Sequence, residues 1–134
     1  MIVVDSSVLV AFFNTRDALY DRAVSLVRRL HDDEFGSRIL LEYVVIEVTS
    51  TLLNRSNFEV SRRACEVLAN SEDYDFQQCS SVFPFARTDF LSQPSGKLSL
   101  VDCAIAHVAR TRAQGRIATF DEALRNAPGI VGVG

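Results

Sequence analysis

Long hydrophobic runs and paired cysteines are both missing from this sequence of 134 residues. The apolar stretch at the N-terminus is interrupted by Asp5, is too short to cross a bilayer and is preceded by no basic segment. The three cysteines are odd in number and form no CxxC pair, which argues against a disulfide framework and a zinc site. We therefore expect a cytoplasmic protein with no membrane association.

Lysine is nearly absent, because Lys97 is the only one among 14 basic residues and the others are arginines. Arginine suits phosphate and carboxylate partners, although a bias in codon usage would produce the same composition. The net charge of −3 argues against a protein that coats nucleic acid without specificity, since such binding depends on many phosphate contacts.

The length, with 48% hydrophobic and 23% charged residues, is typical of a single globular domain, here residues 1–134. Strands and helices are expected to alternate along it. Strands are expected at 2–4, 38–41, 116–120 and 130–133, and helices from near 7, from 21 until before Gly36, and at 43–54, 61–70, 99–112 and 121–126. This order predicts an α/β domain with a mainly parallel twisted sheet flanked by helices, and it leaves the local fold of 76–96 open.

Acidic residues follow two of the expected strands directly. Asp5 comes after the first strand and is followed by two hydroxyl residues, and Asp121 comes after the strand that begins at Arg116. Ligands of open parallel sheets bind beyond the carboxyl ends of the strands, so both acids are expected at the same edge.

Two further acids are expected near this edge, each with apolar neighbours in the sequence. Glu47 lies one turn into the helix after the second strand, and Asp102 lies in the first turn of the helix that begins near Ser99. A pair of carboxylates about 5 Å apart repels by roughly 3 kcal/mol at an effective dielectric constant near 20. Divalent cations with a preference for oxygen ligands, Mg²⁺ or Mn²⁺, would relieve this repulsion.

Helix capping is the alternative role for the three aspartates. Asp5 and Asp121 each precede an expected helix, and Asp102 stands three residues after Ser99, as in a capping box. Glu42 is a second candidate for the position that we assign to Glu47. Residue types alone leave these alternatives open.

Four segments of the chain together resemble the successive motifs of PIN-domain ribonucleases. The segments are Val3–Leu9 around Asp5, Val45–Val48 around Glu47, Leu98–Ala106 around Asp102, and Ile117–Asp121. Size and motif order are most similar to the VapC toxins of type II toxin-antitoxin systems. Each motif is short, but four in this order cover nearly the whole chain.

The resemblance implies a metal-dependent endoribonuclease that hydrolyses RNA phosphodiesters with a metal-activated water. Asp5, Glu47, Asp102 and Asp121 would be the catalytic and metal-binding acids, with Mg²⁺ or Mn²⁺ as the cofactor. Ser7 and Thr119 would support them through hydrogen bonds. The resemblance also implies a homodimer, an RNA substrate and a cognate antitoxin protein.

Two other functions compete with this prediction. A phosphatase of the haloacid dehalogenase type also has an aspartate after its first strand, but it needs a second aspartate two residues later, where this chain has Ser7. A PIN-like module without catalysis, used for protein binding, is the second alternative. The presence of all four acids argues against it.

Overall fold

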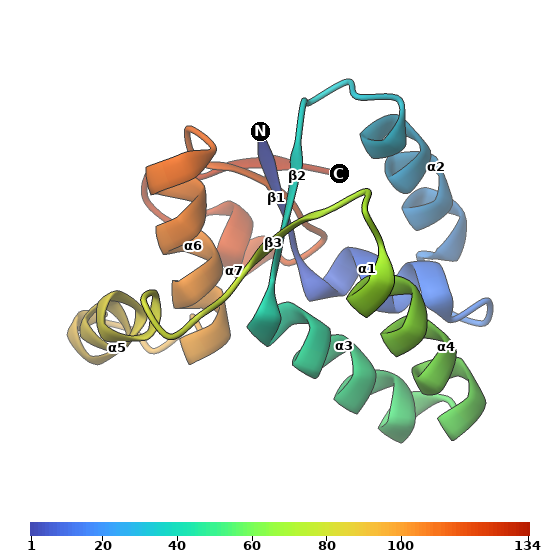
Figure 1. Cartoon of the computed structure of the whole chain (residues 1–134). Coiled ribbons are helices and arrows are strands. Elements are labelled where there is room, and N and C mark those ends of the chain that lie inside the picture. Colours follow the sequence, from blue (N-terminus) through green and yellow to red (C-terminus); the bar gives the residue numbers. More distant parts are fainter.

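Five short strands form one parallel sheet in the computed structural model, which describes residues 1–134 (Figure 1). The order of strands across the sheet is β3-β2-β1-β4-β5. Their bounds are β1 Ile2–Val4, β2 Arg38–Leu41, β3 Asp75–Gln77, β4 Arg116–Ala118 and β5 Val131–Val133. Every neighbouring pair is parallel, which confirms the predicted α/β class.

Seven helices surround this sheet. Their bounds are α1 Ser6–Phe13, α2 Tyr20–His31, α3 Glu42–Arg55, α4 Phe58–Asn70, α5 Phe83–Ser92, α6 Leu100–Arg112 and α7 Glu122–Arg125. In Figure 1, α5 and α6 lie to the left of the sheet, and α1, α2 and α4 lie to its right. The helix α1 packs against α2 and α3, α3 against α4, and α5 against α6. None of these helices has the length and apolar character that a membrane span requires.

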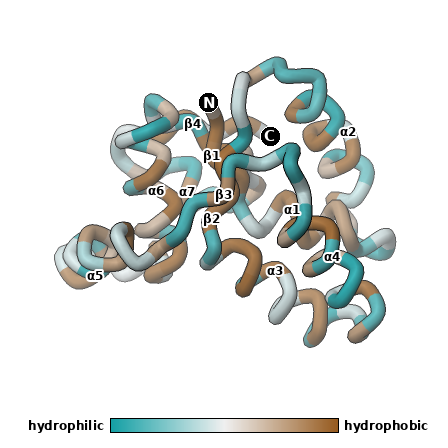
Figure 2. Tube along the Cα trace, in the orientation of Figure 1, coloured by the Kyte–Doolittle hydropathy of each residue, from teal (hydrophilic) through white to brown (hydrophobic).

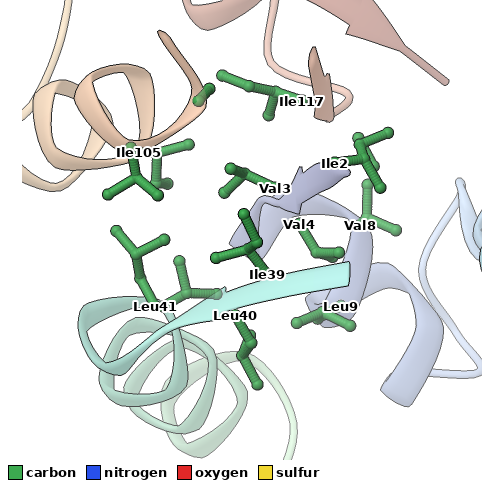
Figure 3. Close-up of a cluster of buried hydrophobic side chains, with 14 of the residues drawn as sticks. Ile2, Val3, Val4, Val8, Leu9, Ile39, Leu40, Leu41, Ile105 and Ile117 are labelled. Carbon is green, nitrogen blue, oxygen red and sulfur yellow. The ribbon is translucent and has the colours of Figure 1, made fainter. Parts of the chain in front are cut away.

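The core forms where β1 and β2 are covered by α1 and α6. All three residues of β1 are fully buried, as are Ile39, Leu40 and Leu41 of β2. Figure 3 shows Ile39 and Leu40 pointing to opposite sides of β2, so this strand contributes to the packing on both faces of the sheet. Burying each large apolar side chain stabilises the fold by about 1.5–3 kcal/mol.

The helices α2 and α4 are amphipathic. Along α2 and α4, Figure 2 shows hydrophobic and hydrophilic residues in alternation. In α2, the buried positions Ala23, Leu26, Val27 and Leu30 follow helical spacing.

Several observed boundaries differ from the expected ones, most by one or two residues, and α2 already ends at His31. The strand β4 ends at Ala118, and Thr119 and Phe120 lead out of the sheet. The helix α4 begins at Phe58, because the side chain of Asn57 caps it by accepting from the amide of Val60. The segment 76–96, which the sequence left open, contains α5 and most of β3, which begins one residue earlier at Asp75.

The order in which strands are added to the sheet changes side at β1, in the centre of the sheet. From β1 the chain continues outward through β2 and β3 on one side, whereas β4 and β5 extend the sheet on the other side. Such a reversal opens a crevice beyond the carboxyl ends of the central strands. Asp5 lies at this position, and its amide donates a 3.0 Å hydrogen bond to the carbonyl of Ala118 at the end of β4.

Candidate active site

Asp5 is held in place by hydroxyl and amide donors at the end of β1. Only 2% of its surface is exposed. Its Oδ1 accepts from the amide of Ser6 at 2.8 Å, and its Oδ2 accepts from Ser7 Oγ at 2.6 Å and from Thr119 Oγ1 at 2.7 Å. These bonds offset the cost of burying a carboxylate and fix its orientation. Ser7 and Thr119 thus contact the acid that they were predicted to support.

Glu47 reaches the same place from the second turn of α3. The hydroxyl of Ser6 lies between the two acids and donates to Glu47 Oε1. Burial raises the pKa of the Glu47 carboxyl, and the negative charges of Asp5, Asp102 and Asp121 raise it further. The structure therefore places the other three predicted acids within electrostatic reach of Glu47.

Asp102, in the first turn of α6, caps this helix and also lies near the other acids. Its Oδ2 accepts from the amide of Ser99 at 2.9 Å, while its own amide donates to Ser99 Oγ at 3.0 Å, which completes a capping box. Burial raises the pKa of the Asp102 carboxyl, and the charges of Asp5 and Asp121 add to this effect. The residue is thus both a capping residue and a neighbour of the other acids.

Asp121 caps the short helix α7 and is linked to Asp5 through Thr119. Its Oδ1 accepts from the amide of Ala123 at 2.9 Å. Its amide donates to Thr119 Oγ1 at 3.0 Å, and the same hydroxyl donates to Asp5. Thr119 therefore couples the loops that follow β1 and β4.

We call Asp5, Glu47, Asp102 and Asp121 the acidic cluster. In this structure, a residue of the cluster can also cap a helix. Asp5, Asp102 and Asp121 each use one carboxylate oxygen to accept from a backbone amide at the start of a helix. The capping bonds orient the three side chains, and they leave Oδ1 of Asp102 and Oδ2 of Asp121 without a hydrogen-bond partner. These two oxygens are available to a ligand.

A groove of about 410 Å³ adjoins the acids. The residues that line it include Ser6, Asp17, Glu47, Arg55, Phe120 and Asp121. The sequence did not single out Ser6, Asp17 or Arg55 for this place. Ser6 stands next to Asp5 in the first motif, so that motif carried a signal for it, whereas nothing in the sequence places Asp17 or Arg55 beside the acids.

Glu42 and the two histidines lie away from the four acids. Glu42 Oε1 accepts from the amide of Cys79 at 3.2 Å, and the residue lines a separate hollow with Ile46 and Phe76. Of the two alternatives in this part of α3, only Glu47 joins the cluster. The two histidines are also elsewhere: His31 lies 3.9 Å from an oxygen of Asp73, and His107 stacks on Phe85 with 4.5 Å between ring centroids.

Comparison with known proteins agrees with this architecture. The sequence model of the PIN domain matches residues 2–130. No curated protein matches the chain in sequence. Among solved structures, the chain is similar to VapC20 of Mycobacterium tuberculosis, a toxin that cleaves the sarcin-ricin loop, with a TM-score of 0.84 and 19% sequence identity over 97% of each chain. At this identity the likeness shows a shared fold. Because the PIN-domain model matches nearly the whole chain, the chain belongs to the PIN-domain family.

Proposed function

We propose that residues 1–134 act as a single-domain endoribonuclease that requires Mg²⁺ or Mn²⁺ and serves as the VapC-type toxin of a toxin-antitoxin module. One observation carries the proposal: Asp5, Asp102 and Asp121, which come from separate parts of the chain, lie within electrostatic reach of Glu47 near the carboxyl ends of β1 and β4, and Glu47 and Asp121 line the groove there. Membership of the PIN-domain family supports it independently.

The donor set fits a hard divalent cation. All candidate ligands are carboxylate oxygens, which suit Mg²⁺ and Mn²⁺. No three His, Cys, Asp or Glu side chains lie close enough together to bind one ion directly. Mg²⁺ commonly binds one or two carboxylates and keeps several water molecules, so a site with fewer than three direct carboxylate ligands is compatible with it.

In this proposal, Asp5, Glu47, Asp102 and Asp121 would hold the ion, directly or through water. A bound divalent ion lowers the pKa of a water molecule and offsets negative charge on a phosphodiester. The protein contributes the orientation of its acids: Ser7 and Thr119 hold Asp5, and Ser6 holds Glu47. The raised pKa values of Glu47 and Asp102 would fall again when a cation lies beside them.

The toxin assignment rests on the family and on the likeness to VapC20. It implies a cognate antitoxin that inhibits the enzyme, a homodimer, and action in the cytoplasm. Because VapC20 cleaves the sarcin-ricin loop, a structured ribosomal RNA loop is the first substrate to test. Transfer RNA and messenger RNA are the next, since all contain the same phosphodiester.

A PIN-like module without catalysis remains the alternative function. Such a module would bind its partner without using the free oxygens of Asp102 and Asp121. The phosphatase alternative is weakened further, because Ser7 donates a hydrogen bond to Asp5 at the position where that class needs an acid.

RNA cleavage by the purified protein, freed of any antitoxin, distinguishes these alternatives. We expect cleavage with Mg²⁺ or Mn²⁺, none with a chelator, and a loss of more than about a hundredfold in Asp5→Asn. Asp32→Asn, which removes an exposed carboxylate at the end of α2, is the matched control and should cleave normally. Unchanged cleavage by Asp5→Asn would show that the acidic cluster is not the active site.

A further inference from the structure

The groove beside the acids, lined by Glu47 and Asp121, is called the acidic groove below. A second hollow, of about 480 Å³, lies next to it and is lined by three arginines. Arg16 belongs to the loop between α1 and α2, Arg55 is the last residue of α3, and Arg63 lies in the second turn of α4. These segments meet toward the lower right of Figure 1. No aspartate or glutamate lines this arginine hollow.

The three guanidinium groups have no carboxylate partner in the structure. Five other arginines form salt bridges with acids: Arg29, Arg38, Arg62, Arg110 and Arg112. The contrast is sharpest on α4, where Arg62 pairs with Glu59 and Glu66, whereas its neighbour Arg63 lines the hollow unpaired. In a chain with more acidic than basic residues, three unpaired arginines in one concavity form a site suited to an anion.

The remaining lining fits a nucleotide better than a simple anion. Asn57 caps α4, so the positive end of that helix dipole lies at the hollow. Phe12 and Tyr20 also line it, and aromatic side chains are the usual partners of unstacked bases. Arginine supplies paired donors that match phosphate oxygens.

The hollow and the acidic groove are joined through Arg55, which lines both. A strand whose scissile phosphate lies at the acids would therefore pass Arg55 and enter the hollow. We propose that the arginine hollow binds a flanking nucleotide of single-stranded RNA, with Arg16, Arg55 and Arg63 on its phosphate and Phe12 or Tyr20 against its base. The inference rests on the proposed ribonuclease function.

Helix-end electrostatics and an acidic protein partner each account for less of the observed arrangement. Arg55 lies in the last turn of α3, where a cation interacts favourably with the helix dipole, but this reason does not apply to Arg16 or Arg63. An acidic protein segment would satisfy the three charges, but it gives no reason for the aromatic walls or for the continuity with the acidic groove.

Arg63→Ala tests the site, and Arg62→Ala is its matched control. Both remove one exposed positive charge from α4, but only Arg63 lines the hollow. Binding is measured by fluorescence anisotropy with a labelled single-stranded RNA, in the Asp5→Asn background so that no cleavage interferes. We expect Arg63→Ala to raise Kd about tenfold and to reduce the slope of log Kd against log salt by about 0.7. Arg16→Ala should act similarly, and Arg62→Ala should leave both quantities nearly unchanged.

The outcomes separate the hollow from the proposed function. Equal effects of Arg63→Ala and Arg62→Ala on Kd and salt slope would overturn the site, whether or not the wild-type protein cleaves RNA. A failure to cleave would overturn the ribonuclease and leave this binding measurement intact. If a peptide of aspartate and glutamate lost affinity in Arg63→Ala while RNA binding did not change, the hollow would be a docking site for protein, and the proposal would be wrong.

Discussion

Thr119 Oγ1 donates a 2.7 Å hydrogen bond to Oδ2 of Asp5, across 114 residues of sequence. The same oxygen accepts from the amide of Asp121 at 3.0 Å. The fully buried hydroxyl therefore ties together the ends of two neighbouring strands, each of which delivers one acid to the cluster. Its loss should disturb both stability and the geometry of the site.

Thr119→Val removes this hydroxyl with little change in volume. We expect the free energy of unfolding to fall by about 1–3 kcal/mol, because the Asp121 amide loses its acceptor and Asp5 loses a donor in a buried position. RNA cleavage should fall by about 10–100-fold. Urea unfolding and initial cleavage rates measure the two effects. Thr119→Ser keeps the hydroxyl and should retain most of both; a fully active Thr119→Val would exclude the positioning role.

Divalent cations should stabilise the folded protein. An ion that binds the folded state alone adds about 2.7 kcal/mol when its concentration is a hundred times Kd. We therefore expect Tm to rise with Mg²⁺ or Mn²⁺ and to return to its initial value with a chelator. Asp102→Asn should weaken the response, since it removes a charge whose neighbours are Asp5 and Asp121. An equal rise of Tm in wild type and Asp102→Asn would place the stabilising ion elsewhere.

The stability of the metal-free protein should depend on pH through Glu47. Its pKa is raised by burial and by the neighbouring acids, whereas in the unfolded chain it is about 4.3. Between these two values the folded state binds more protons, so the contribution of this group to the unfolding free energy falls as pH rises and is level above the raised pKa.

The variant Glu47→Gln lacks this pH-dependent contribution to the unfolding free energy. Comparing it with the wild-type protein therefore isolates the contribution of Glu47. Groups with the opposite behaviour, such as Glu34, whose pKa is lowered by its hydrogen bond with Arg29, are present in both proteins and cancel. The difference in unfolding free energy, variant minus wild type, should therefore increase with pH above about 4.3 and then become constant. Urea unfolding in chelator at several pH values measures it, and a flat difference would contradict the raised pKa.

Gly115→Ala should destabilise the fold at the start of β4. Gly115 has a φ of +81°, and a Cβ there would lie 2.0 Å from the carbonyl oxygen of Gly129. We expect a loss of more than about 1 kcal/mol in unfolding free energy. Gly96→Ala is the matched control, because Gly96 has a φ of +62° but nothing within 4 Å of such a Cβ. Equal losses in both variants would show that backbone strain dominates and that the contact with Gly129 does not matter.

The sequence was most informative where one feature dominates the local signal. The buried β-branched run of β1 and the helical spacing in α2 and α6 identified those elements, because burial repeats with a period that residue types reveal. The segment around β3 and α5 lacks such a signal. Two of the three residues of β3 are exposed, and in α5 only Ala86 is buried while Phe83, Phe85, Phe90 and Leu91 are exposed. Hydrophobic residues that face outward contradict the pattern on which the prediction depends.

The sequence by itself determined the parallel α/β class and the candidate set Asp5, Glu47, Asp102 and Asp121. The class follows from the alternation of strands and helices. The candidate set combines the position of an acid after a strand or in the first turns of a helix with the resemblance to PIN-domain motifs, which favours Glu47 over Glu42. Only the tertiary structure decided that capping and clustering coexist, that Ser6 joins Asp5 to Glu47, and that Arg16, Arg55 and Arg63 share one hollow. These relationships depend on which strands and helices become neighbours in space, and that choice is made by the packing of the whole chain.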